Sequence, residues 1–352
     1  MKKYNIAVFI GRFQPFHHEH LKIIENAYQI ADKVIIIVGS ACKPRTDKNP
    51  FSFDERKQMI SGSIWNNRSA FGDRFRMNDF IIESNVDTIY NDTAWATRIQ
   101  QIVNKHASPT DSVTLVGCKK DDTTYYLDMF PQWALNVFPF DKNINATDIR
   151  SLYFKENSNL DYIDKVVPYA TLRMLELFKK TPEYEQVVNE VNFNNTYRKQ
   201  FDHLPYPPIF VTTDAVVNCC GHVLMIRRRS EPGKGLWALP GGFVNAKTDE
   251  SLQSACLREL REETGLKVPQ PVLIGNIKDS RPFDAIGRSS RGRTITHAFY
   301  IELTDKTLPK VKGSDDADKA KWIPLSKVRS DECFEDHFEI IHYFMGTPIV
   351  NE

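Results

Sequence analysis

Cysteine is scarce in this 352-residue chain, and its six copies form no CxxC pair and no repeated metal-ligand spacing. A disulfide framework is therefore not indicated, and free thiols in a reducing compartment are the simpler interpretation. Long apolar runs are also missing. The first apolar stretch ends at Arg12, too early for a signal-peptide core, and no run approaches the roughly 18 residues of a membrane helix. We expect a cytoplasmic protein with no membrane partner.

An excess of charge of one sign is likewise absent. The formal net charge is +1, and 41% apolar with 26% charged residues is ordinary for a folded, soluble protein. This balance argues against a large nucleic-acid surface, so no nucleic-acid partner is expected, although local basic clusters can still bind small anions. The length exceeds the usual roughly 100–200 residues of one domain and predicts two.

The first half of the chain has the pattern of a parallel α/β sheet. Residues 4–10 and 33–39 are short β-branched apolar runs typical of buried parallel strands, and residues 20–31 between them have helical spacing. Strand, loop, helix and strand in this order form the repeating unit of such a sheet. Further elements are expected as strands at 79–83, 112–117 and 135–140 and as helix within 156–178.

The domain boundary is predicted within residues 181–206. This stretch is rich in Asn and Tyr and leads into Pro205, Pro207 and Pro208, which resist both helix and central strand. We therefore predict a first domain at 1–180, a linker at 181–206 and a second domain at 207–352. The second domain begins with two strand-like runs, 209–217 and 222–229, and contains a strongly helical segment at 250–264.

A candidate phosphate-binding loop follows the first predicted strand, with the sequence Gly-Arg-Phe-Gln-Pro-Phe-His-His-Glu-His at 11–20. A loop between a parallel strand and a helix points backbone N–H groups at the crevice above the sheet, where phosphate is favoured. His17 and His20 can share one face of the first helical turn. At 144–150, Asn145 or Thr147 could cap a helix, and Arg150 offers a planar fork suited to phosphate oxygens.

These segments resemble the nucleotidyltransferase superfamily, whose motifs are HxGH and (I/V)SxTxxR. Glu19 stands where the first motif has glycine, and Asn145 where the second has serine. Further segments look like archaeal-type NMN adenylyltransferases: Asn49-Pro50-Phe51 with Glu55-Arg56, the stretch 92–95, and the stretch 125–133.

The resemblance implies a Rossmann-like domain with a parallel sheet, in which the phosphate of NMN attacks the α-phosphorus of ATP and releases pyrophosphate. It assigns catalytic roles to His17, His20 and Arg150. Its implied substrate-binding residues are Gly11, Arg12, Lys48, Asp92, Trp95 and Thr147. Mg²⁺ is expected to bridge the ATP phosphates, held mainly by ATP and water. Related transferases often assemble, so a homo-oligomer is expected.

Structural roles remain open for several of these residues. An HxxH pair alone is more often a surface feature, and only the combined motifs favour function. Trp95 is as typical of a core as of a ligand platform, and Lys48 is equally typical of an ordinary loop. Tyr125, Tyr126 and Trp133 favour packing or a subunit interface. A carboxylate at Glu19 would repel phosphate unless it points away.

The second half contains a candidate metal-binding helix. Glu259, Glu262 and Glu263 are spaced i, i+3 and i+4, which places three carboxylates in one narrow arc. Each like-charge pair costs a few tenths of a kcal/mol when solvated, and a divalent cation such as Mg²⁺ or Mn²⁺ removes that cost. A solvated acidic helix face is the alternative.

This helix resembles the Nudix box, GX5EX7REUXEEXGU. Glu250, Arg258 and Gly265 fit its spacing, whereas Gly242 lies two positions too early, as if the loop contained a two-residue insertion. The resemblance implies an α/β/α Nudix domain with a mixed sheet. Glu259, Glu262 and Glu263 would be the metal ligands, with Glu263 also catalytic, and ADP-ribose or a related nucleoside diphosphate would be hydrolysed.

Other features of the second half leave alternatives open. The run 281–293 carries four arginines and a phenylalanine, which could bind phosphate and stack on a base or could form a solvated loop. Two functional alternatives also remain. The first domain could use another phosphate acceptor, and the Nudix domain could be a nucleotide sensor.

Overall fold

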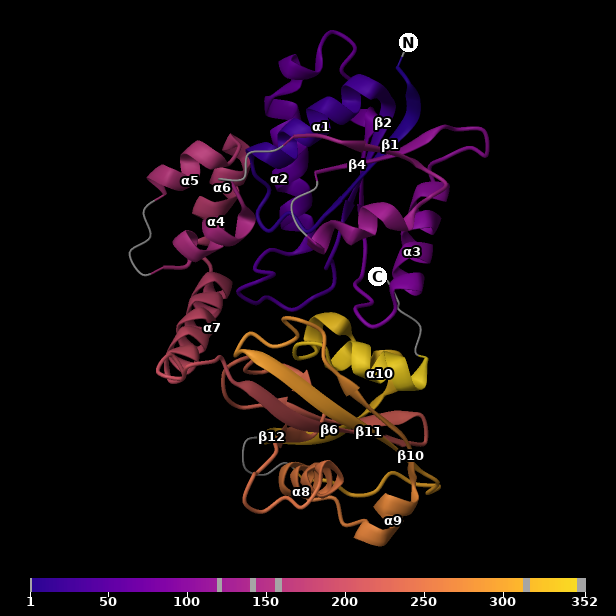
Figure 1. Ribbon diagram of the computed structural model, residues 1–352, viewed down its shortest axis with the longest axis vertical. Helices are drawn as coiled ribbons and strands as arrows, with labels where there is room; N and C mark the ends of the chain where they lie inside the picture. The colour runs from indigo at the N-terminus through magenta and orange to yellow at the C-terminus, as the bar shows by residue number, and fades with distance from the viewer. Residues whose placement is uncertain (1, 119–121, 140–143, 156–159, 313–316, 347–352) are drawn as a thin grey trace. The chain divides into compact units, whose positions relative to one another are not determined.

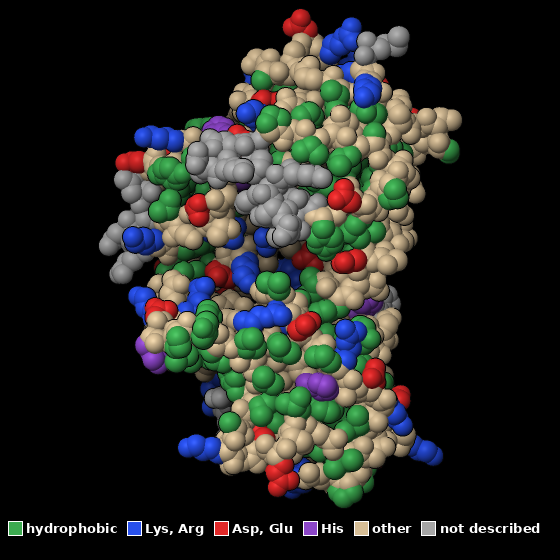
Figure 2. Space-filling view, in the orientation of Figure 1, with side chains coloured by type: hydrophobic (Ala, Val, Ile, Leu, Met, Phe, Trp, Pro, Cys, Tyr) green, Lys and Arg blue, Asp and Glu red, His purple; other side chains and the backbone are tan. Residues whose placement is uncertain are grey.

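The computed structural model describes residues 2–118, 122–139, 144–155, 160–312 and 317–346. The chain forms two compact units, Met1–Val188 and Asn189–Glu352. In the part of the chain that the structure describes, no helix has the length and apolarity needed to cross a membrane. The described residues include all six cysteines, and none of them forms a disulfide. Acidic and basic side chains are interspersed over the face seen in Figure 2, in keeping with the small net charge.

The first unit is built on a five-stranded parallel sheet, as predicted (Figure 1). Its strands are β1 (Tyr4–Gly11), β2 (Ala31–Val38), β3 (Phe80–Ser84), β4 (Val113–Gly117) and β5 (Ala134–Val137). They lie in the order β3-β2-β1-β4-β5. After β1, the chain adds β2 and β3 on one side of it, and then β4 and β5 on the other side. In sheets of this type, ligands bind outside the carboxyl end of the strand where the order reverses, which is β1 here.

Helices cover this sheet by burying their apolar faces. Helix α1 (His18–Ile30) packs on β1 and β2, and α2 (Phe53–Asn66) packs on α1 and on α6 (Tyr169–Phe178). Helix α3 (Asp92–Asn104) buries Ile99 and Val103 against alternate residues of β1 and β2. Short 3-10 turns are at Arg68–Phe71, Met77–Asp79 and Asp122–Met129.

Three predictions for this unit need correction. The helical stretch expected within 156–178 is two helices, α5 (Asp161–Val166) and α6, because Pro168 caps α6 in an extended conformation. Residues 156–159 lie outside the described residues. The strand expected at 135–140 ends at Val137, and residue 140 is also outside them. The predicted linker is not irregular: residues 182–199 form helix α7 (Pro182–Lys199), within which the division between the units falls.

The prolines of this stretch do not interrupt α7. Pro205, Pro207 and Pro208 all lie after α7, and Pro182 occupies its first position, where the missing N–H removes no helical hydrogen bond.

The second unit is built on a mixed sheet. Its strands are β6 (Ile209–Cys219), β7 (His222–Arg228), β8 (Trp237–Ala238), β9 (Gly241–Phe243), β10 (Ile277–Phe283), β11 (Arg293–Leu303) and β12 (Ala317–Pro324). The order is β10-β11-β6-β7-β12, with β8 on β7 and β9 on β6. Strands β6 and β11 are parallel along their whole length, and the other neighbours are antiparallel.

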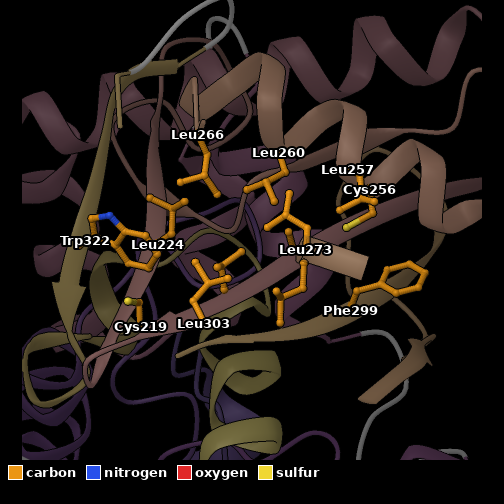
Figure 3. Packing of buried hydrophobic residues seen from close by; sticks show 13 residues of the cluster. Cys219, Leu224, Cys256, Leu257, Leu260, Leu266, Leu273, Phe299, Leu303 and Trp322 are labelled. Carbon is orange, nitrogen blue, oxygen red and sulfur yellow. The ribbon is translucent and has the colours of Figure 1, made fainter. Parts of the chain in front are cut away.

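Helices lie on both faces of this sheet, in agreement with the α/β/α arrangement implied by the resemblance. Helices α8 (Leu252–Thr264) and α9 (Gln270–Gly275) cover one face, and α10 (His337–Met345) covers the other (Figure 1). Figure 3 shows Leu257 and Leu260 of α8 directed into a cluster with Leu224, Phe299 and other strand residues. Burial of each leucine stabilises the fold by about 1.5–3 kcal/mol. This packing fixes which face of α8 is left for its glutamates.

A buried ion pair anchors the start of α10 in the second unit. The Arg288 guanidinium donates to Asp336 through Nε at 2.8 Å and Nη2 at 2.7 Å, and the two side chains are 3% and 2% exposed. Removing one partner of such a pair leaves an uncompensated buried charge, which is strongly destabilising.

Asp336→Ala is therefore expected to lower the unfolding free energy of the second unit by about 3–5 kcal/mol. Hydrogen exchange of peptides from this unit measures that quantity separately from the first unit. Asp331→Ala is the matched control, because its pair with Arg329 is exposed, 56% and 40%, and such pairs contribute about 0–1 kcal/mol. Equal losses in the two variants would contradict the role given to burial.

Candidate active sites

The histidine loop connects β1 to α1 at the carboxyl edge of the parallel sheet. His17 is the N-cap of α1, and its backbone N–H donates to Nδ1 of His20 at 3.2 Å. The two imidazoles stack, with ring centroids 3.5 Å apart, and Phe13 packs edge-on against His20. Because Nδ1 of His20 accepts a hydrogen bond, the neutral ring carries its proton on Nε2. The pair is thus pre-oriented, with Nε2 of His20 as a donor.

Gly11 is required by the shape of this loop. A Cβ at position 11 would lie 2.7 Å from the ring of Phe13, which folds back over it with a φ of 52°. Arg12, between them, is exposed. Glu19 is 8% exposed, so the carboxylate that replaces the motif's glycine is largely buried.

Arg150 is brought to the same loop from far along the sequence. Asn145 caps α4 (Ala146–Tyr153) by accepting from the N–H of Asp148 at 2.9 Å, which settles the choice between Asn145 and Thr147. The Arg150 guanidinium donates to the carbonyl of Gln14 at 2.7 Å and to that of Asp47, next to Lys48, at 2.9 Å. Arg150 of α4 therefore brings together the histidine loop, through Gln14, and the loop after β2 that contains Asp47 and Lys48.

The charge on Arg150 is poorly solvated there. The side chain is 9% exposed, and burial, with the nearby positive charge of Arg12, lowers its pKa to about 10. A third bond reaches Thr147 at 3.4 Å, so the hydrogen bonds to described residues leave two of its five N–H donors for an anion. A phosphate would relieve the repulsion between the two guanidinium groups.

Arg56 organises this site without having been predicted as part of it. Its side chain is 0% exposed, and its Nη1 donates at 2.7 Å to the carbonyls of both Arg12 and Gly39. Further bonds go to the carbonyls of Ser40 and Ser52. Arg56 thereby joins the loops that follow β1 and β2. Its spacing with the buried residues Met59, Ile60 and Ser63 is the sequence signal, an arginine on the core face of a helix.

Trp95 and Asp92 lie on the first turn of α3. Trp95 packs against Tyr126 and Phe130, with centroids 6.0 Å from each, so it belongs partly to the core. The Tyr126 hydroxyl donates to the carbonyl of Ile10 at 3.4 Å, which places this cluster beside the end of β1. Asp92 is exposed and accepts from Tyr125.

Several buried polar atoms of the described residues have no hydrogen-bond partner, and they lie on loops that follow the strands of this sheet and on α3. Among the described residues, they include Oδ1 of Asp47, Oδ1 of Asn49, both amide atoms of Asn85, and Nε of Arg98. Such groups are rare in folded proteins and call for an explanation, such as a ligand that supplies the missing partners.

The second candidate site lies where β9 meets α8. The N–H of Gly241 donates to Oε2 of Glu263 at 2.9 Å, and a Cβ on Gly242 would be 2.6 Å from Oε1 of Glu259. The absence of a side chain at Gly242 makes room for the Glu259 carboxylate, whereas at Gly241 it lets β9 lie close to Thr213 and Asp214 of β6. Gly265 ends α8 with a φ of 58°, as its place in the motif predicts.

The carboxylates of this site are held in an unfavourable environment. Burial raises the pKa of Glu263 to about 8, and the nearby Glu259 and Asp214 carboxylates add to the rise, whereas the Gly241 amide and Arg228 oppose it. Burial also raises the pKa of Glu259. A divalent cation would favour the ionised forms, and oxygen ligands of this kind suit Mg²⁺ or Mn²⁺.

Arg258 organises the remaining acids of the motif. It donates bidentately to Asp249, at 2.9 and 2.8 Å, and through Nη1 to Glu259 and Glu262. Glu262 is half exposed and Glu250 is exposed. The structure thus unites Glu259 with Glu263 and turns Glu262 toward Arg258. The carboxylate paired with Arg258 is that of Asp249, whereas the adjacent Glu250 of the motif is exposed.

Two carboxylates are fewer than a complete metal site. Within the described ranges, no group of three or more His, Cys, Asp or Glu side chains is placed to hold a metal ion. Glu259 and Glu263 nevertheless fit a hard cation whose other ligands are water and substrate oxygens, as is usual for Mg²⁺.

Both halves of the chain match known protein families. The cytidylyltransferase-like family matches residues 8–157, and the NUDIX domain matches residues 210–344. A crystal structure of a bifunctional NMN adenylyltransferase/ADP ribose pyrophosphatase from Francisella tularensis, complexed with AMP and a manganese ion, is 35% identical with a TM-score of 0.86. It covers 97% of this chain and 99% of its own.

The chain belongs to this bifunctional family. Relatives of each half support the assignment. A nicotinamide/nicotinic acid mononucleotide adenylyltransferase of Acinetobacter baylyi is 36% identical over 188 residues, 53% of this chain and 93% of that protein. An ADP-ribose pyrophosphatase of Methanocaldococcus jannaschii is 32% identical over 135 residues, 38% of this chain and 72% of that protein.

In this bifunctional NMN adenylyltransferase/Nudix protein, Gly242 provides a direct test of the acid site. In Gly242→Ala the new methyl group would displace the Glu259 carboxylate from Glu263, while the flexible glutamate can move without unfolding the unit. We expect ADP-ribose hydrolysis to fall about a hundredfold, as for other small misplacements of catalytic groups, with NMN adenylylation unchanged.

Gly275→Ala is the matched control, because nothing lies within 4 Å of a Cβ at the end of α9. Both reactions are measured on the same preparations. If Gly242→Ala hydrolysed ADP-ribose at the wild-type rate, the position of Glu259 would not matter for the reaction and its assignment to this site would be wrong.

Proposed function

We propose that the first unit makes NAD by transferring the adenylyl group of ATP to NMN, and that the second unit hydrolyses ADP-ribose or a related nucleoside diphosphate. The transferase is assigned to residues 1–180 and the hydrolase to 207–352. The observation that carries the first assignment is the bond from Arg150 to the carbonyl of Gln14, because it unites the two nucleotidyltransferase motifs. For the second, it is the bond from Gly241 to Glu263.

In the transferase, an oxygen of the NMN phosphate attacks the α-phosphorus of ATP, and the bond from that phosphorus to the bridging oxygen of pyrophosphate breaks. Charge grows on the departing pyrophosphate. His17, His20 and Arg150, with Lys48 as a further cation, are assigned to the ATP phosphates. Catalysis then consists of positioning and charge stabilisation rather than of a covalent intermediate.

The loop that carries these groups is assigned to binding as well. Gly11 is assigned to this loop because it makes room for the Phe13 ring, and Arg12 and Thr147 are assigned to substrate binding beside Arg150. Trp95 is assigned to stacking on the nicotinamide ring and Asp92 to its amide edge. Mg²⁺ bound with ATP would lower the repulsion between the phosphate groups.

In the hydrolase, Glu259 and Glu263 are assigned to a divalent cation, Mg²⁺ or Mn²⁺, with Glu262 as a third candidate. Such an ion polarises a diphosphate and activates water when bound. The protein's own contribution is to hold the carboxylates: the Gly241 N–H orients Glu263, and Arg258 keeps α8 and the Asp249 loop together. Water attacks one phosphorus atom, and the bridging P–O bond breaks.

Two substitutions test whether the sites are independent. His20→Ala removes the donor above β1 and is expected to abolish NAD formation from NMN and ATP while sparing hydrolysis. Glu263→Gln, which keeps the shape but not the charge, is expected to do the reverse. Pyrophosphate release and ADP-ribose cleavage are measured on each variant. Loss of both activities in either one would refute separate sites.

The acceptor is identified by a panel. With ATP or CTP as donor, the full-length protein is offered NMN, its deamidated acid analogue, phosphopantetheine and other phosphate acceptors. We expect pyrophosphate release with ATP and a pyridine mononucleotide. Turnover only with an unrelated acceptor would replace the proposed substrate.

A further inference from the structure

The four arginines of residues 281–293 have different surroundings. Arg281 stacks on Tyr343, with its guanidinium carbon 4.3 Å from the ring centroid. Arg288 is committed to the buried pair with Asp336. Arg293 donates to the carbonyl of Asp284 at 2.6 Å. Structural contacts therefore account for three of the four guanidinium groups.

Arg291 differs from these three. Its Nε is buried and, among the described residues, has no hydrogen-bond partner. Its guanidinium lies over the ring of Phe243, 5.0 Å from the centroid. A buried donor without an acceptor is costly, so this group is one for which a ligand oxygen would supply a missing partner.

Arg291 also lies next to the acid site. Phe243 directly follows Gly242, the residue in contact with Glu259 of α8, so the ring beneath Arg291 belongs to β9, the strand against which the carboxylates of α8 lie. Phe243 in turn packs edge-on against Phe210, with centroids 5.8 Å apart. The guanidinium plane thus rests on a supported surface at the border of the site.

A second guanidinium, that of Arg228, is close to both. Its Nε donates to the carbonyl of Pro232 at 2.8 Å, and its guanidinium carbon is 4.0 Å from the centroid of Phe334. Burial lowers the pKa of Arg228, and the positive charge of Arg291 lowers it further, whereas Glu335 and Glu263 oppose this. Two like charges in a partly buried place next to Glu263 favour a bound anion between them.

We propose that Arg291 binds a phosphate group of the nucleoside diphosphate substrate, with Arg228 as the second cation. This inference deepens the hydrolase function proposed above and rests on it. The Nε–H and one Nη–H of a guanidinium form two parallel donors that match two phosphate oxygens. Carboxylates for the cation and guanidinium groups for the anion then flank the same diphosphate.

The test uses the full chain with Mn²⁺ and ADP-ribose. Arg291→Ala is expected to raise KM about tenfold to hundredfold, the loss of one charge-assisted hydrogen-bonding group, with kcat little changed. Arg291→Lys keeps the positive charge but loses the two parallel N–H donors of the guanidinium. Its KM is therefore expected to lie between those of the wild type and Arg291→Ala. Arg281→Ala, from the same run, is the matched control and is expected to behave as wild type.

Binding without turnover separates this inference from the hydrolase function. In a Glu263→Gln background, calorimetry with ADP-ribose is expected to show weaker binding for Arg291→Ala than for Arg281→Ala, at equal melting temperatures. If the wild type cleaves ADP-ribose and both Arg291→Ala and Arg291→Lys have the KM of the wild type, Arg291 does not bind the phosphate, and the hydrolase function stands. If the wild type does not cleave ADP-ribose but Arg291→Ala still weakens binding, the hydrolase function fails and the phosphate site stands. If the wild type does not cleave ADP-ribose and Arg291→Ala does not weaken its binding, both the hydrolase function and the phosphate site are wrong.

Discussion

Buried charged side chains bonded to backbone groups hold both candidate sites in shape. In the first unit, Arg56 and Arg150 donate to carbonyls of loops that follow different strands. In the second, Glu263 accepts from the N–H of Gly241. A hydrogen bond to a charged group contributes about 1.5–3 kcal/mol, and leaving such a group unpaired is more damaging still. The loops and the charges therefore stabilise one another.

The two sites differ in electrostatic character. Imidazole and guanidinium groups surround the first, which suits a triphosphate, whereas the second combines carboxylates suited to a metal ion with the guanidinium groups of Arg258 and Arg228. Each arrangement is unfavourable by itself, as the lowered pKa of Arg150 and the raised pKa of Glu263 indicate. The opposite charge comes with the ligand in both cases. A net charge of +1 conceals this local separation.

The sequence allowed the sheets and motifs to be predicted because they depend on local patterns. Short β-branched runs indicated β1 and β2, and the spacing of Glu259 and Glu263 placed both on one face of α8. Side-chain partners were harder, because they depend on segments far apart in the chain. The bonds of Arg56 to two loops, the choice of Asp249 over Glu250, and the distinct surroundings of Arg288 and Arg291 follow only from the fold. The prolines at 205, 207 and 208 predict an irregular linker, but they lie beyond the end of α7 and so do not interrupt it.

The parallel pairing of β6 with β11 has a consequence for how the second unit is made. Residue 209 pairs with 293 and residue 219 with 303, so the centre of this sheet joins segments far apart in the chain. Contacts at such separation form slowly, because a long loop must close first. Helix α8 packs both on β6, which precedes it in the chain, and on β11, which follows it. The core beneath the glutamates is therefore completed only when β11 pairs with β6.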